Sequence, residues 1–187
     1  MPNVVNSSTP PSQKDEWRTL PSLYNWLDRE FKFSYDFAAT DDNSLAMGRF
    51  TKERSALDSD NWFYWGTEVA YTNQVGFLNP PFSMVDEFLA KANEQIVLAG
   101  EKYLNPIIVC LVRADAPETK WWRKNVLDED GFIRHEVRYL YPRVPYCDPS
   151  GEVQKNVLWP SALIIMRPKP WRYVRWFNWK LHAGENT

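Results

Sequence analysis

The feature that most constrains the fold is an exclusively apolar run at residues 106–112, which closely follows a long amphipathic pattern. A strand that is apolar at every position is typical of the buried centre of a parallel sheet covered by helices. The pattern before it is helical, with one apolar face made by Val85, Phe88, Leu89, Ala92, Ile96 and Ala99. Another apolar strand is predicted at residues 75–78. The strand–helix–strand order predicts an α/β fold.

The remaining elements are predicted from the same kinds of pattern. We expect helices at residues 22–31, with Ser22 as the N-cap, and at 118–127. The helix after residue 82 begins with the capping box Ser83–Asp86 and ends at Gly100. Further strands are predicted at residues 33–39, 133–141 and 162–166. Because the last strands lie close together in the chain, we expect an antiparallel strand at the edge of a mixed, mostly parallel sheet with flanking helices.

The chain of 187 residues fits one domain between two short ends. Residues 1–15 are predicted to be a flexible tail, since the first thirteen are rich in Pro, Ser and Asn and lack the apolar stretch of a signal peptide. Residues 16–166 form the predicted domain. Residues 167–187 form a basic, aromatic extension. No apolar run is long enough for a transmembrane helix.

Composition excludes several classes of protein. The seven glycines form neither a phosphate-binding nor a dinucleotide-binding loop. Two histidines and two cysteines, without a C-x-x-C spacing, argue against a zinc site, a disulfide framework and histidine-dependent nucleophilic catalysis. We therefore expect no metal, and a reducing cytoplasmic compartment. The net charge of −2 excludes a globally basic nucleic-acid binder but not a local basic surface.

The most informative motif is Asn79-Pro80-Pro81-Phe82, which follows one predicted strand and precedes the long helix. Ligands of open α/β sheets bind beyond the carboxyl ends of the strands. Two prolines stiffen this turn and hold Asn79 extended. The Asn79 side-chain oxygen and the Pro80 carbonyl can then accept both N–H bonds of a ring amine, while Phe82 offers a flat face to the ring. The alternative is that the tetrapeptide only connects a strand to a helix.

A pair of acceptors on an amine has a chemical consequence. The lone pair of an exocyclic purine amine is delocalised into the ring. Two acceptors that each take a hydrogen bond from one of its N–H groups favour a pyramidal nitrogen with a localised lone pair. The acceptors bind more tightly as positive charge grows on nitrogen during attack on a methyl donor, which stabilises the transition state preferentially.

Several blocks of the chain, in order, resemble the phage-type DNA adenine-N6 methyltransferase (Dam-type) family. Their residue ranges are 16–19, 27–31, 33–40, 79–83, 113–115 with 119–122, and 160–165. The resemblance implies a Rossmann-like fold of the kind found in S-adenosylmethionine (SAM)-dependent methyltransferases. It also implies SAM as methyl donor, and DNA containing a target adenine as the partner, with no membrane and no obligatory protein partner. The chain departs from the family pattern at Thr19-Leu20-Pro21, where the proline is displaced by one position.

The same resemblance implies roles for individual residues. Catalysis is assigned to the tetrapeptide at residues 79–82. The expected cofactor-binding residues are Trp17, Thr19, Asp36, Ala38, Asp41 and Asp60. Asp36 would pair with the ammonium group of SAM, Asp41 and Asp42 are candidates for its ribose hydroxyls, and Asp60 would bind its adenine. Each of these carboxylates has the alternative role of an ordinary cap or surface acid.

Cations interleaved with aromatic residues suit the backbone and bases of DNA. The predicted DNA-binding residues are Arg113, Lys120, Trp122, Arg172 and Arg175. The alternative is that the aromatic residues pack on the core and the cations are solvated.

The sequence thus predicts an enzyme that methylates N6 of an adenine flipped out of the duplex. If phage-encoded, it would act in the host cytoplasm. Two alternatives stay open, a cytosine-N4 DNA methyltransferase and a non-catalytic, aromatic-rich DNA-binding protein.

Overall fold

The structure is a computed structural model that describes residues 15–63, 74–101, 105–114, 117–154, 157 and 159–184. Residues 1–14, which make up nearly all of the predicted tail, lie outside these ranges.

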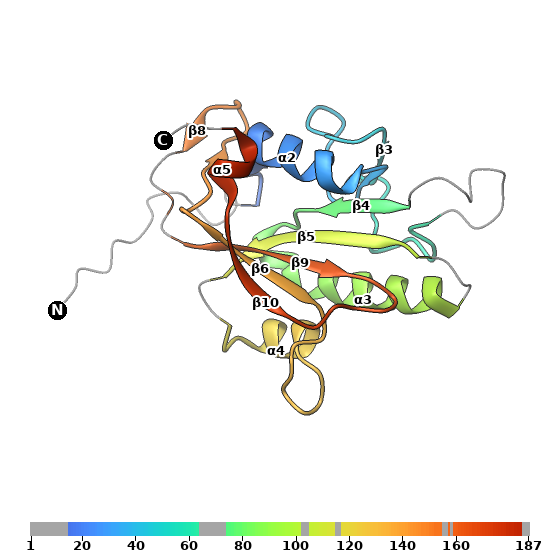
Figure 1. Cartoon of the computed structure of the whole chain (residues 1–187). Helices are drawn as coiled ribbons and strands as arrows, with labels where there is room; N and C mark the ends of the chain where they lie inside the picture. The colour runs from blue at the N-terminus through green and yellow to red at the C-terminus, as the bar shows by residue number, and fades with distance from the viewer. Residues whose placement is uncertain are drawn as a thin grey trace.

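A mixed sheet runs through the middle of the molecule (Figure 1). Its seven strands, in spatial order, are β10 (Val174–Asn178), β6 (Glu136–Tyr141), β9 (Ser161–Met166), β5 (Ile107–Arg113), β4 (Val75–Leu78), β2 (Tyr35–Asp36) and β3 (Gly48–Arg49). Every neighbouring pair is parallel except the two that involve β9. The predicted mostly parallel α/β sheet is therefore confirmed. The expected place of its antiparallel strand is wrong, because β9 lies between β5 and β6 and not at an edge.

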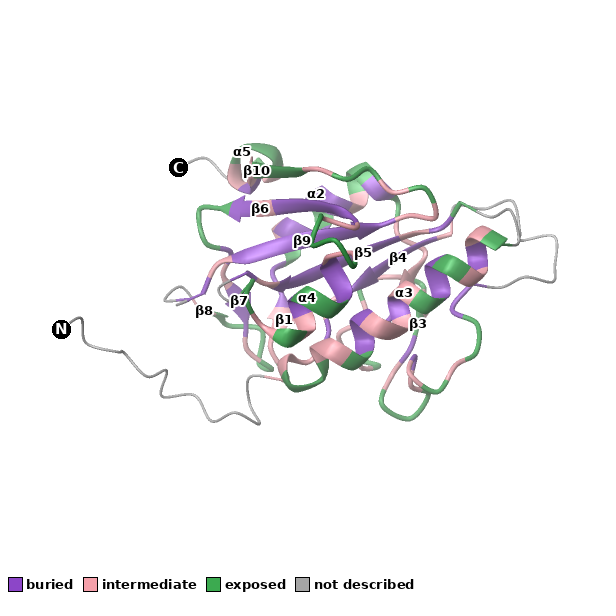
Figure 2. Ribbon diagram, turned by 90° about the horizontal axis from the view of Figure 1, so that it is seen from below, coloured by how far each residue is buried: buried purple, intermediate pink, exposed green. Residues whose placement is uncertain are grey.

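Helices cover both faces of the sheet (Figure 1). One face carries α2 (Pro21–Phe31) and α5 (Trp179–Ala183), and the other carries α3 (Val85–Glu101) and α4 (Lys120–Val126). Each layer encloses its own cluster of buried apolar side chains. Figure 2 shows the central strands buried and α3 buried along the side that faces them, which is how an amphipathic helix covers a sheet.

A small second sheet closes one end of the molecule. It consists of β1 (Arg18–Thr19), β7 (Tyr146–Cys147) and β8 (Val153–Gln154), with β7 in the middle. The antiparallel register pairs Thr19 with Tyr146, so the start of the described chain is held by a segment from its last third.

The helix ends differ from the sequence predictions. Ser22 lies inside α2 and not at its cap, because Pro21, whose fixed φ suits a first helical position, begins the helix. Ser83 forms no capping box, because it lies in a 3-10 turn, η2 (Phe82–Met84), and bonds to Asp15. Gly100 does not end α3, which continues to Glu101.

One glycine sets the distance between the loop after β2 and the sheet. A Cβ atom on Gly76 would lie 1.9 Å from the Phe37 ring, so only glycine allows this approach. Phe37 in turn stacks on Trp62, with ring centroids 4.2 Å apart.

The C-terminal segment completes this architecture. β10 pairs with β6 at one edge of the sheet, and the Trp179 side chain is fully buried against the α2 face. In the described part of the chain, no helix combines the length and apolar character needed to cross a lipid bilayer.

Candidate active site

The candidate site is a cavity of about 630 Å³ at the carboxyl edge of the parallel strands. A cavity of this size can hold a small-molecule cofactor. It is lined by residues 15–19, by the loop after β2, by residues around Thr51 and Ser55, by the turn after β4, and by the β7–β8 segment.

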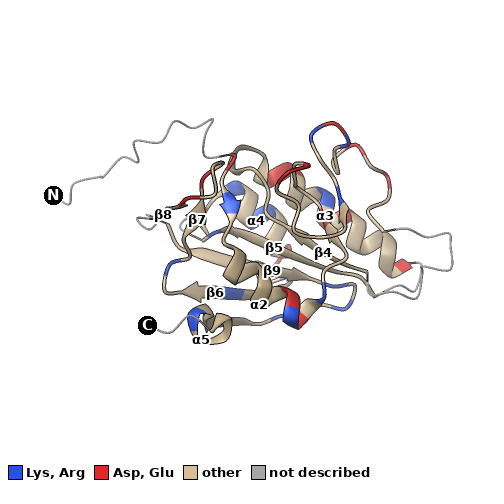
Figure 3. Cartoon of the chain, turned by 90° about the horizontal axis from the view of Figure 1, so that it is seen from above, with Lys and Arg blue, Asp and Glu red and all other residues tan. Residues whose placement is uncertain are grey.

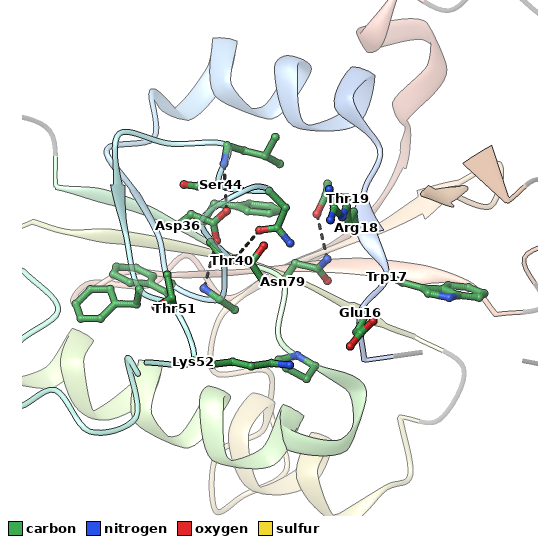
Figure 4. A pocket seen from close by; sticks show the side chains of 18 of the residues that line it. Glu16, Trp17, Arg18, Thr19, Asp36, Thr40, Ser44, Thr51, Lys52 and Asn79 are labelled. Atoms are coloured by element: carbon green, nitrogen blue, oxygen red, sulfur yellow. Dashed lines mark hydrogen bonds between the residues drawn. The ribbon is translucent and has the colours of Figure 1, made fainter. Parts of the chain in front are cut away.

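Register explains why two predicted site residues meet here. β2 and β4 are parallel neighbours, and Asp36 pairs with Phe77. Asn79 follows Phe77 by two residues, so both side chains emerge at the same edge of the sheet. Both line the cavity. In Figure 4, Asn79 lies near the centre of the cavity, with Asp36 and Thr40 on one side and Thr19 and Arg18 on the other.

The Asp36 carboxylate is buried and has no cation beside it within the described residues. Burial raises its pKa to about 6, and hydrogen bonds from two backbone N–H groups oppose this rise. The donors are Ala38, at 3.2 Å from Oδ1, and Leu45, at 3.4 Å from Oδ2. A cationic group bound in the cavity would offset the cost of ionising this acid.

Within the part of the chain that the structure describes, the Asn79 amide is held by one side-chain hydrogen bond. Its Nδ2 donates to Thr19 Oγ1 at 3.1 Å. This leaves the amide oxygen for another partner. The Pro81 carbonyl accepts from the Met84 N–H at 3.0 Å, whereas no N–H of the described residues donates to the Pro80 carbonyl. Both predicted acceptors thus lack a donor among the described residues, but Pro80 is buried and, unlike Asn79 and Pro81, is not part of the cavity lining.

Phe82 lies beside the cavity and is not part of its lining. Its ring meets Tyr146 and Trp159 edge to face, with centroids 6.2 and 5.6 Å away. Trp17 packs against Trp159 at 5.3 Å. We call Trp17, Phe82, Tyr146 and Trp159 the aromatic cluster. Arg113, the last residue of β5, places its guanidinium 5.6 Å from the Phe82 ring centroid and 4.7 Å from that of Trp159.

The predicted cofactor-binding residues separate into two groups. Four of them line the cavity: Trp17, Thr19, Asp36 and Ala38. Asp41 and Asp60 do not. Asp41 forms an ion pair with Arg49, at 2.8 Å. Asp60 is exposed, and its backbone carbonyl accepts a hydrogen bond from the Gln95 side chain.

Asp42, the other ribose candidate, does line the cavity, and sequence reasoning missed further lining residues, among them Asn43, Ser44, Thr51 and Lys52. It also missed Tyr146 and Trp159 in the aromatic cluster. No local pattern marks these positions, because the loops that carry them meet only in the folded chain.

The predicted DNA-binding residues do not form one surface. Arg113 ends β5 at the edge where the cavity lies, and Lys120 begins α4, the next helix. Trp122 is 2% exposed and belongs to the core, so it lacks the surface that a direct DNA contact needs. Its packing explains this correction, since it faces Tyr139 of the sheet.

Arg172 and Arg175, both in the C-terminal segment, lie further away and have acidic partners. Arg172 precedes β10, which places it at the amino edge of the sheet, opposite the cavity, and it pairs with Asp128 at 2.9 Å. Arg175 lies within 3.9 Å of the buried Glu136. Figure 3 shows basic and acidic positions interspersed along the ribbon.

Known proteins that are similar to this chain are DNA methyltransferases. A family model described as "DNA N-6-adenine-methyltransferase (Dam)" matches residues 6–179. The DNA N-6-adenine-methyltransferase of Haemophilus phage HP1 (strain HP1c1) is 26% identical over 172 residues, covering 89% of this chain and 86% of the relative. The DNA N-6-adenine-methyltransferase of Escherichia phage T1 is 30% identical over 91 residues, covering 48% of this chain and 34% of the relative.

Proposed function

The chain belongs to the DNA N-6-adenine-methyltransferase (Dam) family, and its reaction is methylation of adenine N6 in DNA. We propose that the cavity beside Asn79 binds SAM and that the turn at residues 79–82 presents the adenine amine to it. Neither alternative, cytosine-N4 methylation or non-catalytic DNA binding, is favoured by the family match.

The observation that carries this proposal is the shared cavity of Asn79 and Asp36. An acceptor for an amine and an acid without a cation lie side by side at the carboxyl ends of adjacent parallel strands. An amine-holding group and a cofactor-holding group must be neighbours for direct transfer between two bound molecules.

The cavity suits SAM in its chemistry. The Asp36 carboxylate would pair with the ammonium group, and Ala38 offers only a small side chain at the point of close approach. Asp42, which lines the cavity, is better placed for ribose hydroxyls than Asp41, and Asp60 is not needed. Trp17 and Thr19 would close the cavity from the side of β1. When bound, SAM supplies an electrophilic methyl group on a sulfonium.

The protein's part in the transfer is to hold and polarise the amine. The Asn79 Oδ1 atom and the Pro80 carbonyl each accept a hydrogen bond from one of its two N–H groups. Both acceptors gain interaction energy as positive charge develops on the nitrogen, so they stabilise the transition state more than the bound substrate. The amine proton becomes acidic once the nitrogen is alkylated and can leave to water, so no strong base is required of the side chains.

Adenine N6 is paired inside a duplex, so the target base must leave the stack to reach this turn. Phe82 is proposed to stack on the extruded base, with the rest of the aromatic cluster forming the wall behind it. Arg113 and Lys120 are proposed to contact the phosphates or bases nearby. Arg172 and Arg175 would contact DNA only where it extends to the far edge of the sheet. Both already have acidic partners, which weakens their attraction for phosphates.

Phage relatives support the host cytoplasm as the place of action. DNA containing the target adenine is available there.

The decisive test compares Asn79→Ala with Asn105→Ala, an exposed asparagine before β5 that serves as the matched control. Each protein is incubated with unmethylated DNA and labelled SAM, and the nucleosides are identified by mass spectrometry. We expect N6-methyl-2′-deoxyadenosine from the control and a loss of about a hundred- to a thousandfold in turnover from Asn79→Ala. SAM should still raise the melting temperature of both variants.

Full activity in Asn79→Ala would refute the role of the turn. N4-methylcytosine as the product would reassign the substrate. A protein that shows no SAM-dependent thermal shift, yet binds single strands equally well after Asn79→Ala, would be a binding protein and not an enzyme.

A further inference from the structure

The starting observation is that residues 15–19 hold the catalytic turn at both of its ends. Thr19 Oγ1 accepts from Asn79 at 3.1 Å. Asp15 accepts from the Ser83 N–H at 3.0 Å and from its hydroxyl at 2.6 Å. Between these ties, Arg18 pairs with Asp42 across the cavity at 2.7 Å.

Thr19 is well built to fix another side chain. It is 6% exposed, and its backbone is paired with Tyr146 in the small sheet. A buried, β-branched side chain on a paired strand has few alternative rotamers. Its hydroxyl therefore stays at one point in space.

The orientation of the Asn79 amide decides whether the site works. The amide is nearly symmetric in shape, and a half-turn would exchange its oxygen for an NH2 group. An NH2 group facing the substrate amine would put two donors against each other. In this structure the Thr19 hydroxyl, which can donate or accept, is the acceptor for Nδ2, so the amide oxygen faces away from Thr19, on the side where an acceptor is needed. Donation by Nδ2 also polarises the amide and makes its oxygen a stronger acceptor.

We propose that Thr19 is a positioning residue that orients the Asn79 amide for the adenine amine, and that residues 15–19 clamp the catalytic turn. This inference rests on the proposed function of Asn79. It replaces the direct cofactor contact implied for Thr19 by an action through Asn79.

The first experiment compares Thr19→Val, which keeps the shape and removes the hydroxyl, with Thr19→Ser, which keeps the hydroxyl. SAM affinity is measured by calorimetry, kcat and KM by methyl transfer, and folding by melting temperature. We expect kcat of Thr19→Val to fall between about tenfold and a hundredfold, with SAM affinity within about threefold of the original. Thr19→Ser should recover most of kcat.

A weakened SAM affinity with unchanged kcat in Thr19→Val would overturn the proposal and restore the direct cofactor contact. An equal loss of kcat in Thr19→Ser would also overturn it, since the hydroxyl would then be irrelevant. Neither result would affect the role of Asn79, which is tested separately by Asn79→Ala.

A second experiment uses the symmetry of a carboxylate. In Asn79→Asp both side-chain oxygens are acceptors, so a half-turn of the carboxylate changes nothing. Thr19 then cannot favour one orientation over the other. If Asn79→Asp retains measurable turnover, adding Thr19→Val should reduce kcat by less than about threefold in that background. The same loss in both backgrounds would show that Thr19 acts independently of Asn79.

Discussion

Two buried carboxylates in the same sheet have opposite surroundings. Glu136, in β6, is fully buried and is met by Arg138 at 2.6 Å and Arg167 at 2.8 Å. Asp36, in β2, is 5% exposed and, among the described residues, is met only by two backbone N–H groups at 3.2 and 3.4 Å. Burial alone would raise the pKa of both acids. Hydrogen bonds from Tyr173 and Arg138 reverse this for Glu136, whose pKa is lowered, while the pKa of Asp36 stays raised at about 6.

The difference separates a structural charge from a functional one. The cations around Glu136 come from β6 and from the C-terminal segment, so this cluster joins the edge of the sheet to the chain that covers it. Asp36 lines a cavity, where a bound ligand can supply a cation to pair with the carboxylate. A buried acid beside a cavity is thus a more useful sign of function than a cluster of cations, most of which here have acidic partners.

The largest expected effect comes from breaking the paired acid. Glu136→Gln removes the buried negative charge that Arg138 and Arg167 share, and we expect the free energy of unfolding to fall by about 3–5 kcal/mol. Denaturant unfolding measures this free energy. Glu30→Gln, which removes the more exposed partner of Arg138, is the control and should cost less. A similar loss in both variants would mean that burial of the acid does not matter.

The second prediction concerns one substitution, Asp36→Asn, which should make the protein more stable and its SAM binding weaker. Asp36→Asn removes an acid whose ionisation is unfavourable in the ligand-free protein, so at pH 8 we expect the free energy of unfolding to rise, by up to about 3 kcal/mol. The same variant should bind SAM about ten- to a hundredfold more weakly, because the charge-assisted bond is lost. Calorimetry and denaturant unfolding measure the two quantities. A variant that is less stable and binds SAM normally would make Asp36 a structural acid like Glu136.

The third effect is the pH dependence of SAM binding. The folded-state pKa of Asp36 lies near 6, above its ordinary value of 3.8, so the ligand-free protein holds a proton on this group below about pH 6. Binding of a cation must displace that proton. We expect the SAM Kd to be constant above about pH 7 and to rise by up to about tenfold for each pH unit below 6. In Asp36→Asn this pH dependence should disappear, and its persistence would assign the titration to another group.

The smallest effect is expected from the exposed pair at the rim of the cavity. Asp42 is 68% exposed and pairs with Arg18. Asp42→Asn should weaken SAM binding by less than about fivefold, because water screens an exposed pair. Fluorescence or calorimetric titration at low and high salt measures this. A loss as large as that of Asp36→Asn would make Asp42 a principal cofactor ligand.

Local signals predicted the long elements well. Strand β4 begins and ends at the predicted residues, and α3 and β5 differ from their predictions by a residue or two, since apolar patterns of that length specify both type and position. The predicted cap at Ser83 is wrong because a distant side chain intervenes. Asp15 takes the Ser83 hydroxyl and N–H, and nothing within residues 83–86 indicates this.

The site was only partly predictable. The tetrapeptide at residues 79–82 and Asp36 each follow a recognisable strand. Their adjacency then follows from parallel pairing. The strands β1, β2, β3, β7 and β8 have two residues each, too few for any periodicity. For that reason the contact of Thr19 with Asn79, and the wall formed by Tyr146 and Trp159, could not be inferred from the sequence.

The pairing of Thr19 with Tyr146 has a consequence for how the enzyme is made. The first strand of the small sheet leaves the ribosome long before its partner does. Until β7 has been synthesised and docked, the hydroxyl that steadies Asn79 has no fixed position. A nascent or prematurely terminated chain that ends before residue 146 therefore lacks an assembled methyl-transfer site, and methylation begins only after most of the polypeptide has been translated.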